Sequence, residues 1–275
     1  MQDKTKNLRR TTWILTGIAV FLLTFLLIAG VLLEQAGTNT DFSRKNLSPS
    51  LGMWFGTDWM GRDMFCRTVA GLSLSLRIGI LTSVLSAVTS LCLGILAASG
   101  EKADAVVSWW IDLVMGIPHI LLVMLISLAC GRGMAGVVAG VSLSHWPSLA
   151  RVIRGEVLQL KDAPYILTAE KLGVSRLTII KKHILPHLFP QFVTGMILLF
   201  PHAVLHEASV TFLGFGLGAE QPAIGVILSE SIRYLTTGRW WLTVFPGLSL
   251  MLMTALFAVL GERWRRLLDP SSAHE

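Results

Sequence analysis

The sequence is poor in charged residues. Asp, Glu, Lys and Arg together make up 15% of its 275 residues, whereas 53% are hydrophobic. Soluble domains contain about 25% charged residues, so this composition excludes an ordinary soluble domain and indicates a membrane protein. The formal net charge of +6 does not indicate a nucleic-acid partner, because the basic residues lie beside apolar segments, where membrane topology accounts for them.

Cysteine and catalytic motifs are scarce as well. Cys66, Cys92 and Cys130 show no CxxC or other ligand spacing, so neither a disulfide framework nor a cysteine metal site is indicated. The sequence has no GxxxxGK[ST] and no HExxH, so neither a P-loop nor a zinc-protease site is expected. The FLGFGLG string at 212–218 follows an apolar run without a βαβ pattern, and we expect a helix-end bend there rather than a dinucleotide site.

Long apolar runs are what the sequence has in abundance. They predict an all-α fold, a polytopic integral membrane protein with about six transmembrane helices, since about 20 apolar residues cross a bilayer. The predicted spans are 13–33, 72–99, 105–129, 134–150, 188–213 and 240–260. The first run follows a basic start and could be a signal peptide, but its length and the missing cleavage pattern favour a retained helix.

Charge divides the segments outside these spans between two sides. We predict a cytoplasmic tail at 1–12, an external loop at 34–71, a membrane core at 72–262 that includes a cytoplasmic loop at 151–187, and a second cytoplasmic tail at 263–275. With this assignment, 15 of the 23 Lys and Arg residues lie on the cytoplasmic side. Cytoplasmic segments are enriched in Lys and Arg, so both termini are predicted to be cytoplasmic.

The long polar segment at 151–190 contains the first of two recognisable sequence patterns. Its apolar residues recur at helical spacing and are interrupted by Pro164 and Gly173, which predicts short amphipathic helices joined by turns. Such a loop can belong to any polytopic membrane protein. Within it, TAEKLGVSRLTIIKKHILPHLFP resembles the EAA loop of ABC importer permease subunits, with Ala169, Gly173 and Leu185-Pro186 on family positions.

The literal Glu of the EAA triplet is missing, because Leu167 and Thr168 hold its first two positions. The resemblance implies a coupling helix that docks into a groove on a cytoplasmic ATPase. The residues expected to make this contact are Pro164, Tyr165, Ala169, Glu170, Leu172 and Gly173.

A second pattern lies in the predicted external loop. The string FGTDWMGRDMFCRTVAGLSLSL is similar to the LGTDxxGRDxxSRxxxGxRxSL signature of C-type permease subunits in the peptide and nickel branch of ABC importers. The matching loop residues are Gly56, Thr57, Asp58, Gly61, Arg62, Asp63 and Arg67, and Cys66 stands where Ser is usual. Thr57 or Asp58 can cap backbone N–H groups and Arg62 can pair with its neighbour Asp63, so we predict that this motif orders the loop and has no catalytic role.

The fifth predicted span carries a pair of histidines. His202 and His206 are four residues apart on one helical face, with Glu207 beside them. Ionisable groups at membrane depth usually face a cavity or a partner, and imidazoles suit nickel, copper or zinc. We therefore treat His202 and His206 as a candidate metal pair, and add Glu207, His119 and His145 to the candidate substrate path.

The residues alone leave other roles open for these side chains. The histidines could make ordinary hydrogen bonds within the helix bundle, or serve an intramembrane enzyme together with Glu207. The His-x-x-x-His pattern before FLG, together with LSHW at 143–146, resembles the nickel-uptake permease subunit more than the peptide ones.

These resemblances imply a type I ABC importer permease fold and a subunit without catalytic activity of its own. The implied partners are a second homologous permease in a heterodimer, two cytoplasmic ATPases that carry ATP and Mg²⁺, and an external substrate-binding protein. The chain itself is expected to bind no cofactor and no nucleic acid, and to lie in the cell inner membrane. Nickel, free or chelated, is the expected cargo, and a dipeptide or oligopeptide is the alternative.

Overall fold

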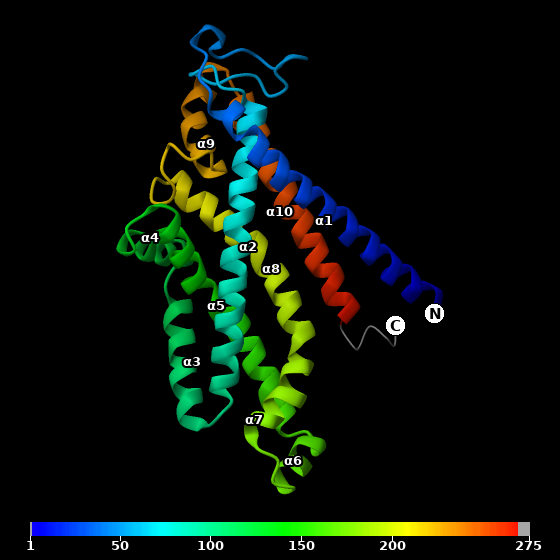
Figure 1. Cartoon of the computed structure of the whole chain (residues 1–275). Helices are drawn as coiled ribbons and strands as arrows, with labels where there is room; N and C mark the ends of the chain where they lie inside the picture. Colours follow the sequence, from blue (N-terminus) through cyan, green and yellow to red (C-terminus); the bar gives the residue numbers. More distant parts are fainter. Residues whose placement is uncertain (1, 269–275) are drawn as a thin grey trace.

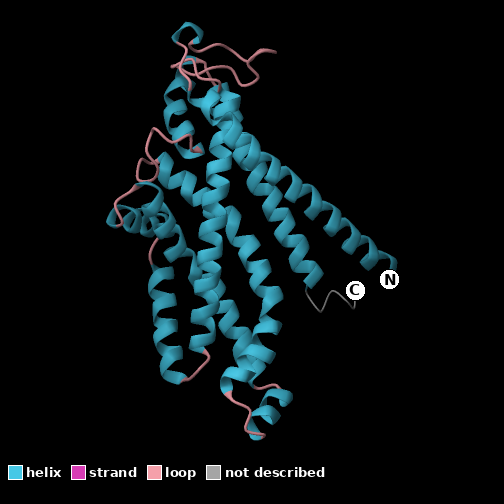
Figure 2. Cartoon of the chain, viewed as in Figure 1, coloured by secondary structure: helices cyan, strands magenta, loops and turns pink. Residues whose placement is uncertain are grey.

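The chain is all-helical over residues 2–268, which are the residues that this computed structural model describes (Figure 1, Figure 2). The long helices are α1 (Gln2–Thr38), α2 (Met64–Ala97), α5 (Gly133–Lys161), α8 (Leu185–Phe212) and α10 (Trp241–Leu268). The shorter ones are α3 (Glu101–Gly116), α4 (His119–Ala129), α6 (Pro164–Lys171), α7 (Arg176–Ile179) and α9 (Ile224–Ser231). Three short segments, η1 (Phe42–Arg44), η2 (Ile180–Ile184) and η3 (Ile232–Thr237), complete the described elements, and η2 is π-helical. The predicted fold class is confirmed.

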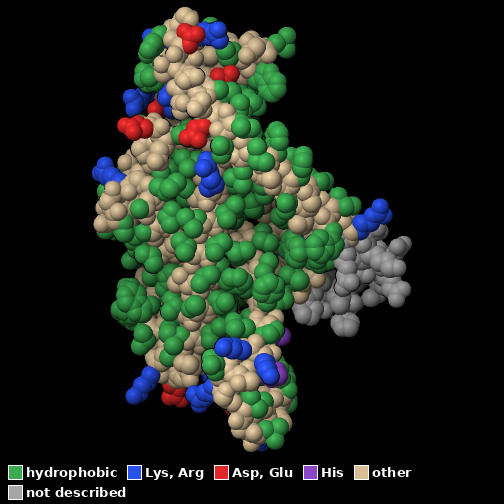
Figure 3. All heavy atoms as spheres, viewed as in Figure 1, with side chains coloured by type: hydrophobic (Ala, Val, Ile, Leu, Met, Phe, Trp, Pro, Cys, Tyr) green, Lys and Arg blue, Asp and Glu red, His purple; other side chains and the backbone are tan. Residues whose placement is uncertain are grey.

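Several helices are long and apolar enough to cross a membrane. They are Arg10–Thr38, Met64–Ala97, Arg176–Phe212 and Trp241–Leu268, and α3 with α4 adds a fifth span if this bent pair is counted as one. Helix α5 corresponds to the remaining predicted span but is not among these apolar helices, and it carries polar side chains in its middle. In the view of Figure 3, apolar side chains cover the middle of the molecule and charged ones gather toward its two ends.

Both ends of the described chain are helical where tails were predicted. Helix α1 begins at Gln2 and α10 continues to Leu268, and 269–275 lie outside the described residues. The two helices run side by side (Figure 1). Trp264 donates its Nε1–H to Thr16 Oγ1 at 3.0 Å and packs edge-on against Trp13.

The predicted span at 105–129 is broken into two helices. Its halves, α3 and α4, meet at an angle of 100°. Ile117 and Pro118 are extended at the break, with ψ of 135° and 119°. A proline disfavours helical backbone in the residue before it, which explains why the chain turns here and restarts at His119.

Helix α5 extends well past the predicted end of its span at 150. It reaches Lys161, so the cytoplasmic loop predicted from 151 begins about three turns later in the chain. Two ion pairs to α3 accompany this extension: Arg154 Nη2 lies 2.6 Å from Asp104 Oδ2, and Arg151 Nη2 lies 2.9 Å from Asp112 Oδ1. The sequence pattern around 151 does not contain these partners, because they lie on another helix.

Helix α2 is the centre of the bundle and packs against α1, α5 and α8 (Figure 1). A side chain at Gly94 would come within 2.7 Å of Ile153 on α5. Ser86 and Ser90 donate their hydroxyls to α5 carbonyls, at 3.1 Å to Ser142 and 2.8 Å to Trp146. Small residues let helix backbones approach closely in lipid, which accounts for the central position of this helix in the bundle.

A buried group of charges ties the loop at 39–63 to α2 and α9. Arg62 and Arg67 both contact Asp58, at 2.6 and 3.0 Å, and both contact Glu230, at 3.0 and 2.7 Å. Asp58 is 3% exposed and Arg67 is 2% exposed. Each charge is therefore balanced by opposite charges where little water reaches it, as a buried ion pair requires. We call Asp58, Arg62, Arg67 and Glu230 the loop charge cluster.

The expected pair between Arg62 and Asp63 is wrong. Asp63 instead caps the start of α2, where its carboxylate accepts the N–H groups of Phe65 and Cys66 at 2.8 and 3.0 Å. An acidic side chain at this position satisfies free N–H groups and favours the helix dipole. Adjacent side chains along the chain often point apart, which leaves Arg62 free to reach Asp58.

Replacing Asp58 by Asn tests the loop charge cluster. The Asn side chain keeps the shape but leaves two arginines facing the single carboxylate of Glu230, so we expect the free energy of unfolding to fall by about 3–5 kcal/mol, as for a broken buried ion pair. Thermal unfolding of the purified protein in detergent measures this loss. The control is Arg44→Gln, which removes the exposed Arg44–Asp41 pair and should change little; equal melting temperatures for the two variants would contradict the prediction.

Candidate functional site

A cavity of about 570 Å³ lies where the α3–α4 break faces α5 and α8. Its polar lining consists of His119, Ser144, His145, Ser148, His202 and His206. Apolar side chains, among them Met115, Ile117 and Leu199, complete the walls. The histidines come from three separate helices, so the cavity depends on how those helices pack.

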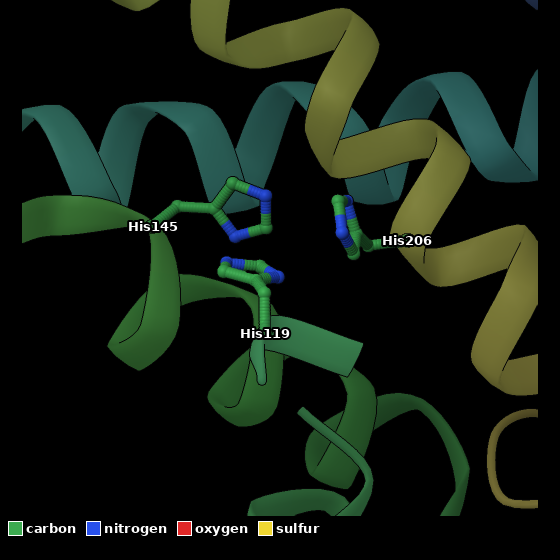
Figure 4. A group of neighbouring side chains, drawn as sticks. All are labelled: His119, His145 and His206. Carbon is green, nitrogen blue, oxygen red and sulfur yellow. The ribbon is translucent and has the colours of Figure 1, made fainter. Parts of the chain in front are cut away.

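Three of these histidines face one another at close range (Figure 4). His119 opens α4, His145 lies in the middle of α5 and His206 lies on α8. The His119 ring centroid is 4.3 Å from that of His145 and 4.3 Å from that of His206, and the last two are 5.0 Å apart. One ring nitrogen from each lies within 4.8 Å of the other two. We call these residues the histidine triad.

Backbone contacts determine which nitrogens of the triad are free. His145 Nδ1 lies 2.8 Å from the Val141 carbonyl, and His206 Nδ1 lies 2.7 Å from the His202 carbonyl. A carbonyl only accepts hydrogen bonds, so each Nδ1 carries the hydrogen and each Nε2 keeps its lone pair. Among the described residues, His145 Nε2 and His119 Nδ1 are buried without a hydrogen-bond partner.

His202, the expected partner of His206, lies at the edge of this arrangement. It lines the cavity and its side chain is exposed. The four-residue spacing does place both histidines on one face of α8, but His206 meets His119 and His145, which reach it from neighbouring helices. The contribution of His202 to the triad is its carbonyl oxygen, which holds the His206 ring.

Glu207 lies outside the cavity, contrary to its expected place on the substrate path. It is fully buried on the side of α8 that faces α2. Ser75 donates its hydroxyl to Glu207 Oε2 at 2.7 Å and Thr211 donates to Oε1 at 3.1 Å. Successive helical residues point about 100° apart, so Glu207 faces away from His206 and links α8 to α2.

The loop charge cluster includes one residue that the sequence motifs miss. Glu230 belongs to α9, far along the chain from Arg62 and Arg67, and no motif singles it out. The available signal is an acidic residue within an otherwise apolar helix, since such a residue in a membrane protein usually has a partner.

The predicted coupling residues lie together at one end of the molecule, on α6 and the turn after it (Figure 1). Pro164 begins α6, where a missing N–H costs no helix hydrogen bond. Gly173 has a φ of +77°, a backbone conformation that disfavours other residues. The chain therefore turns sharply before Ser175, whose hydroxyl caps α7.

The outer face of this segment is apolar and uncovered. Tyr165 is 50% exposed and Leu172 is 78% exposed. Ile166 is buried on the opposite face of α6, Ala169 is half-buried and Glu170 is exposed. We call α6, Gly173 and α7 the coupling segment.

The long apolar helices indicate an integral membrane protein, and the cavity lies among them. The family described as the binding-protein-dependent transport system inner membrane component matches residues 90–274, and the chain belongs to this family. It is therefore a membrane-embedded ABC importer permease subunit, which is not catalytic by itself.

Relatives of similar length are permease proteins. The chain is 30% identical to the dipeptide transport system permease protein DppC of Bacillus subtilis, over 98% of this chain and 85% of that one. It is 32% identical to the oligopeptide permease OppC of the same organism (84% and 77%), and 33% identical to the glutathione permease GsiD of Pectobacterium atrosepticum (84% and 76%).

Solved structures show the same fold. The inward-facing MetNI methionine ABC transporter matches with a TM-score of 0.60 at 18% identity, over 75% of this chain and 98% of that one. The expected type I ABC importer permease fold is thus confirmed.

Proposed function

We propose that the chain forms one half of the translocation pathway of an ATP-driven importer, with a dipeptide or oligopeptide as its cargo. The similarity to the dipeptide permease, which spans 98% of this chain, carries this proposal. The oligopeptide and glutathione permeases among the relatives point to the same class of cargo. The expectation of nickel finds no support in these names.

The proposed complex contains a second, homologous permease, two cytoplasmic ATPases and an external substrate-binding protein. The ATPases would hold ATP and Mg²⁺, since this sequence has no P-loop. The exposed apolar face of the coupling segment supports contact with an ATPase, because an uncovered apolar patch often marks a binding surface.

Nickel, free or chelated, is a second candidate because of one observation. The histidine triad brings three imidazoles together in the cavity, and imidazole is a good ligand for nickel. A peptide pathway alone gives no reason for three histidines to face one another.

Transport by the complete complex, reconstituted in liposomes with its binding protein and ATP, distinguishes the two cargoes. We expect ATP-dependent uptake of labelled dipeptides that continues when metal is removed with a chelator. Uptake of nickel or a nickel chelate without any uptake of metal-free dipeptide would replace the peptide proposal with the nickel one.

Gly173→Val tests the coupling segment. Valine is β-branched and Gly173 has a left-handed backbone, so the turn should lose about 1–2 kcal/mol and the segment should change shape. We expect ATP-dependent transport and ATPase association to fall at least several-fold while the subunit still inserts into the membrane.

The matched control is Gly173→Asn, because Asn adopts the left-handed conformation more readily than most residues. Space is not limiting, since no atom lies within 4 Å of an added side-chain carbon. Normal transport and ATPase binding by Gly173→Val would refute the coupling role.

We further propose that both termini and the coupling segment are cytoplasmic and that the loop at 39–63 is external, in the inner membrane. The distribution of Lys and Arg supports this orientation. Cysteines introduced at Leu51, which is 99% exposed, and at Lys181 test it in a background without the three native cysteines. An impermeant reagent added from outside should label position 51 and spare position 181; labelling in the reverse pattern would overturn the orientation.

A further inference from the structure

We infer that His119, His145 and His206 form a coordination site for a divalent late first-row transition metal ion: nickel, copper or zinc. Three imidazole nitrogens would bind the ion, and one position would stay open to water or to a ligand on the cargo. The inference rests on the proposed function only in placing the cavity on the cargo path.

The geometry of the triad is close to that of a coordination site. Its nitrogens lie within 4.8 Å of one another. In a tetrahedral site with metal–nitrogen bonds of about 2.0–2.1 Å, neighbouring nitrogens are about 3.4 Å apart. The three nitrogens would therefore have to approach one another to hold an ion, and rotation of the rings is the simplest movement that brings them closer.

The hydrogen bonds of the triad leave the correct nitrogens free. A histidine that binds a metal usually donates its other ring N–H to a carbonyl or carboxylate, which fixes the tautomer and the ring orientation. His145 and His206 both do this, toward the carbonyls of Val141 and His202. Their Nε2 atoms are left to bind an ion.

Unpaired buried nitrogens in the triad argue against a purely structural role. His145 is 6% exposed, and its Nε2 is buried without a hydrogen-bond partner among the described residues, as is His119 Nδ1. Leaving a buried polar atom unpaired costs about 1–3 kcal/mol, and a packing role would be met at lower cost by an apolar side chain. A metal ion would engage these nitrogens.

The donor set selects the class of ion. Mg²⁺ and Ca²⁺ require oxygen ligands, and the nearest carboxylate along α8, Glu207, is turned toward Ser75 and Thr211. Imidazole nitrogens suit nickel, copper and zinc. Three protein ligands with one open position resemble exchangeable rather than closed structural sites, and a transport path must release what it binds.

Metal binding by the purified, metal-free complex without a polyhistidine tag tests this site. Nickel bound at equilibrium is measured by dialysis and elemental analysis. We expect one site per chain whose affinity falls at least about tenfold in His145→Ala and in His119→Asn, since the loss of even a supporting partner costs 10–100-fold.

Two matched controls keep the test specific. His202→Ala removes a cavity histidine outside the triad but keeps the carbonyl that orients His206, and His183→Ala removes an exposed histidine of η2. Both should bind nickel like the wild type. Equal nickel binding by the wild type and His145→Ala would contradict the proposed site. A large loss of binding in His202→Ala would also contradict it, and would assign nickel binding to the His202–His206 pair instead.

X-ray absorption counts the imidazole ligands of the ion bound to the wild type, so this measurement does not depend on whether a variant folds. The wild type should show a shell of nitrogen neighbours with the multiple scattering of three imidazoles, and His119→Asn should show two. Fewer than three imidazoles in the wild type would also contradict the proposed site. The binding assay requires no transport, so a failure of peptide uptake would refute the proposed cargo while leaving this result intact.

Discussion

The close approach of helices along α2 is the constraint on which the rest of the structure depends. Lipid offers helices no hydrophobic drive to associate, so small residues and interhelical hydrogen bonds must hold them. Ser86 and Ser90 bind the α5 carbonyls of Ser142 and Trp146, which lie on either side of His145. On another face of α2, Ser75 binds Glu207, the neighbour of His206. The same helix therefore fixes the positions of two members of the triad.

The third member depends on a backbone break rather than on side-chain contacts. Pro118 stops α3, and α4 leaves at 100°. His119 is the first residue after the break, so its ring reaches the cavity from a direction that a continuous helix would not provide. Broken helices at membrane depth are tolerated where they line a cavity or are buried in protein, and the break here lines the cavity.

Local patterns in the sequence were enough for the all-helical fold, most of the membrane spans and the turn at Gly173. Each of these depends on residues close together in the chain. The triad could be predicted only in part, because His119, His145 and His206 lie on three helices and no spacing rule connects them. The i, i+4 rule instead selected His202. This residue shares a face of α8 with His206 but does not contact His119 and His145 as His206 does. Glu230 and the extension of α5 to Lys161 depend on distant partners in the same way.

The triad and the coupling segment are connected through the helices that hold both. Helix α5 comes just before the coupling segment in the chain. Helix α8 follows the segment, as part of a helical stretch that is continuous from Arg176 to Phe212. Helix α4, which carries His119, is not continuous with the coupling segment, but it packs against α5 and α8. His145 and His206 therefore lie on the two helices that are continuous with this segment, and His119 is held against them by helix packing.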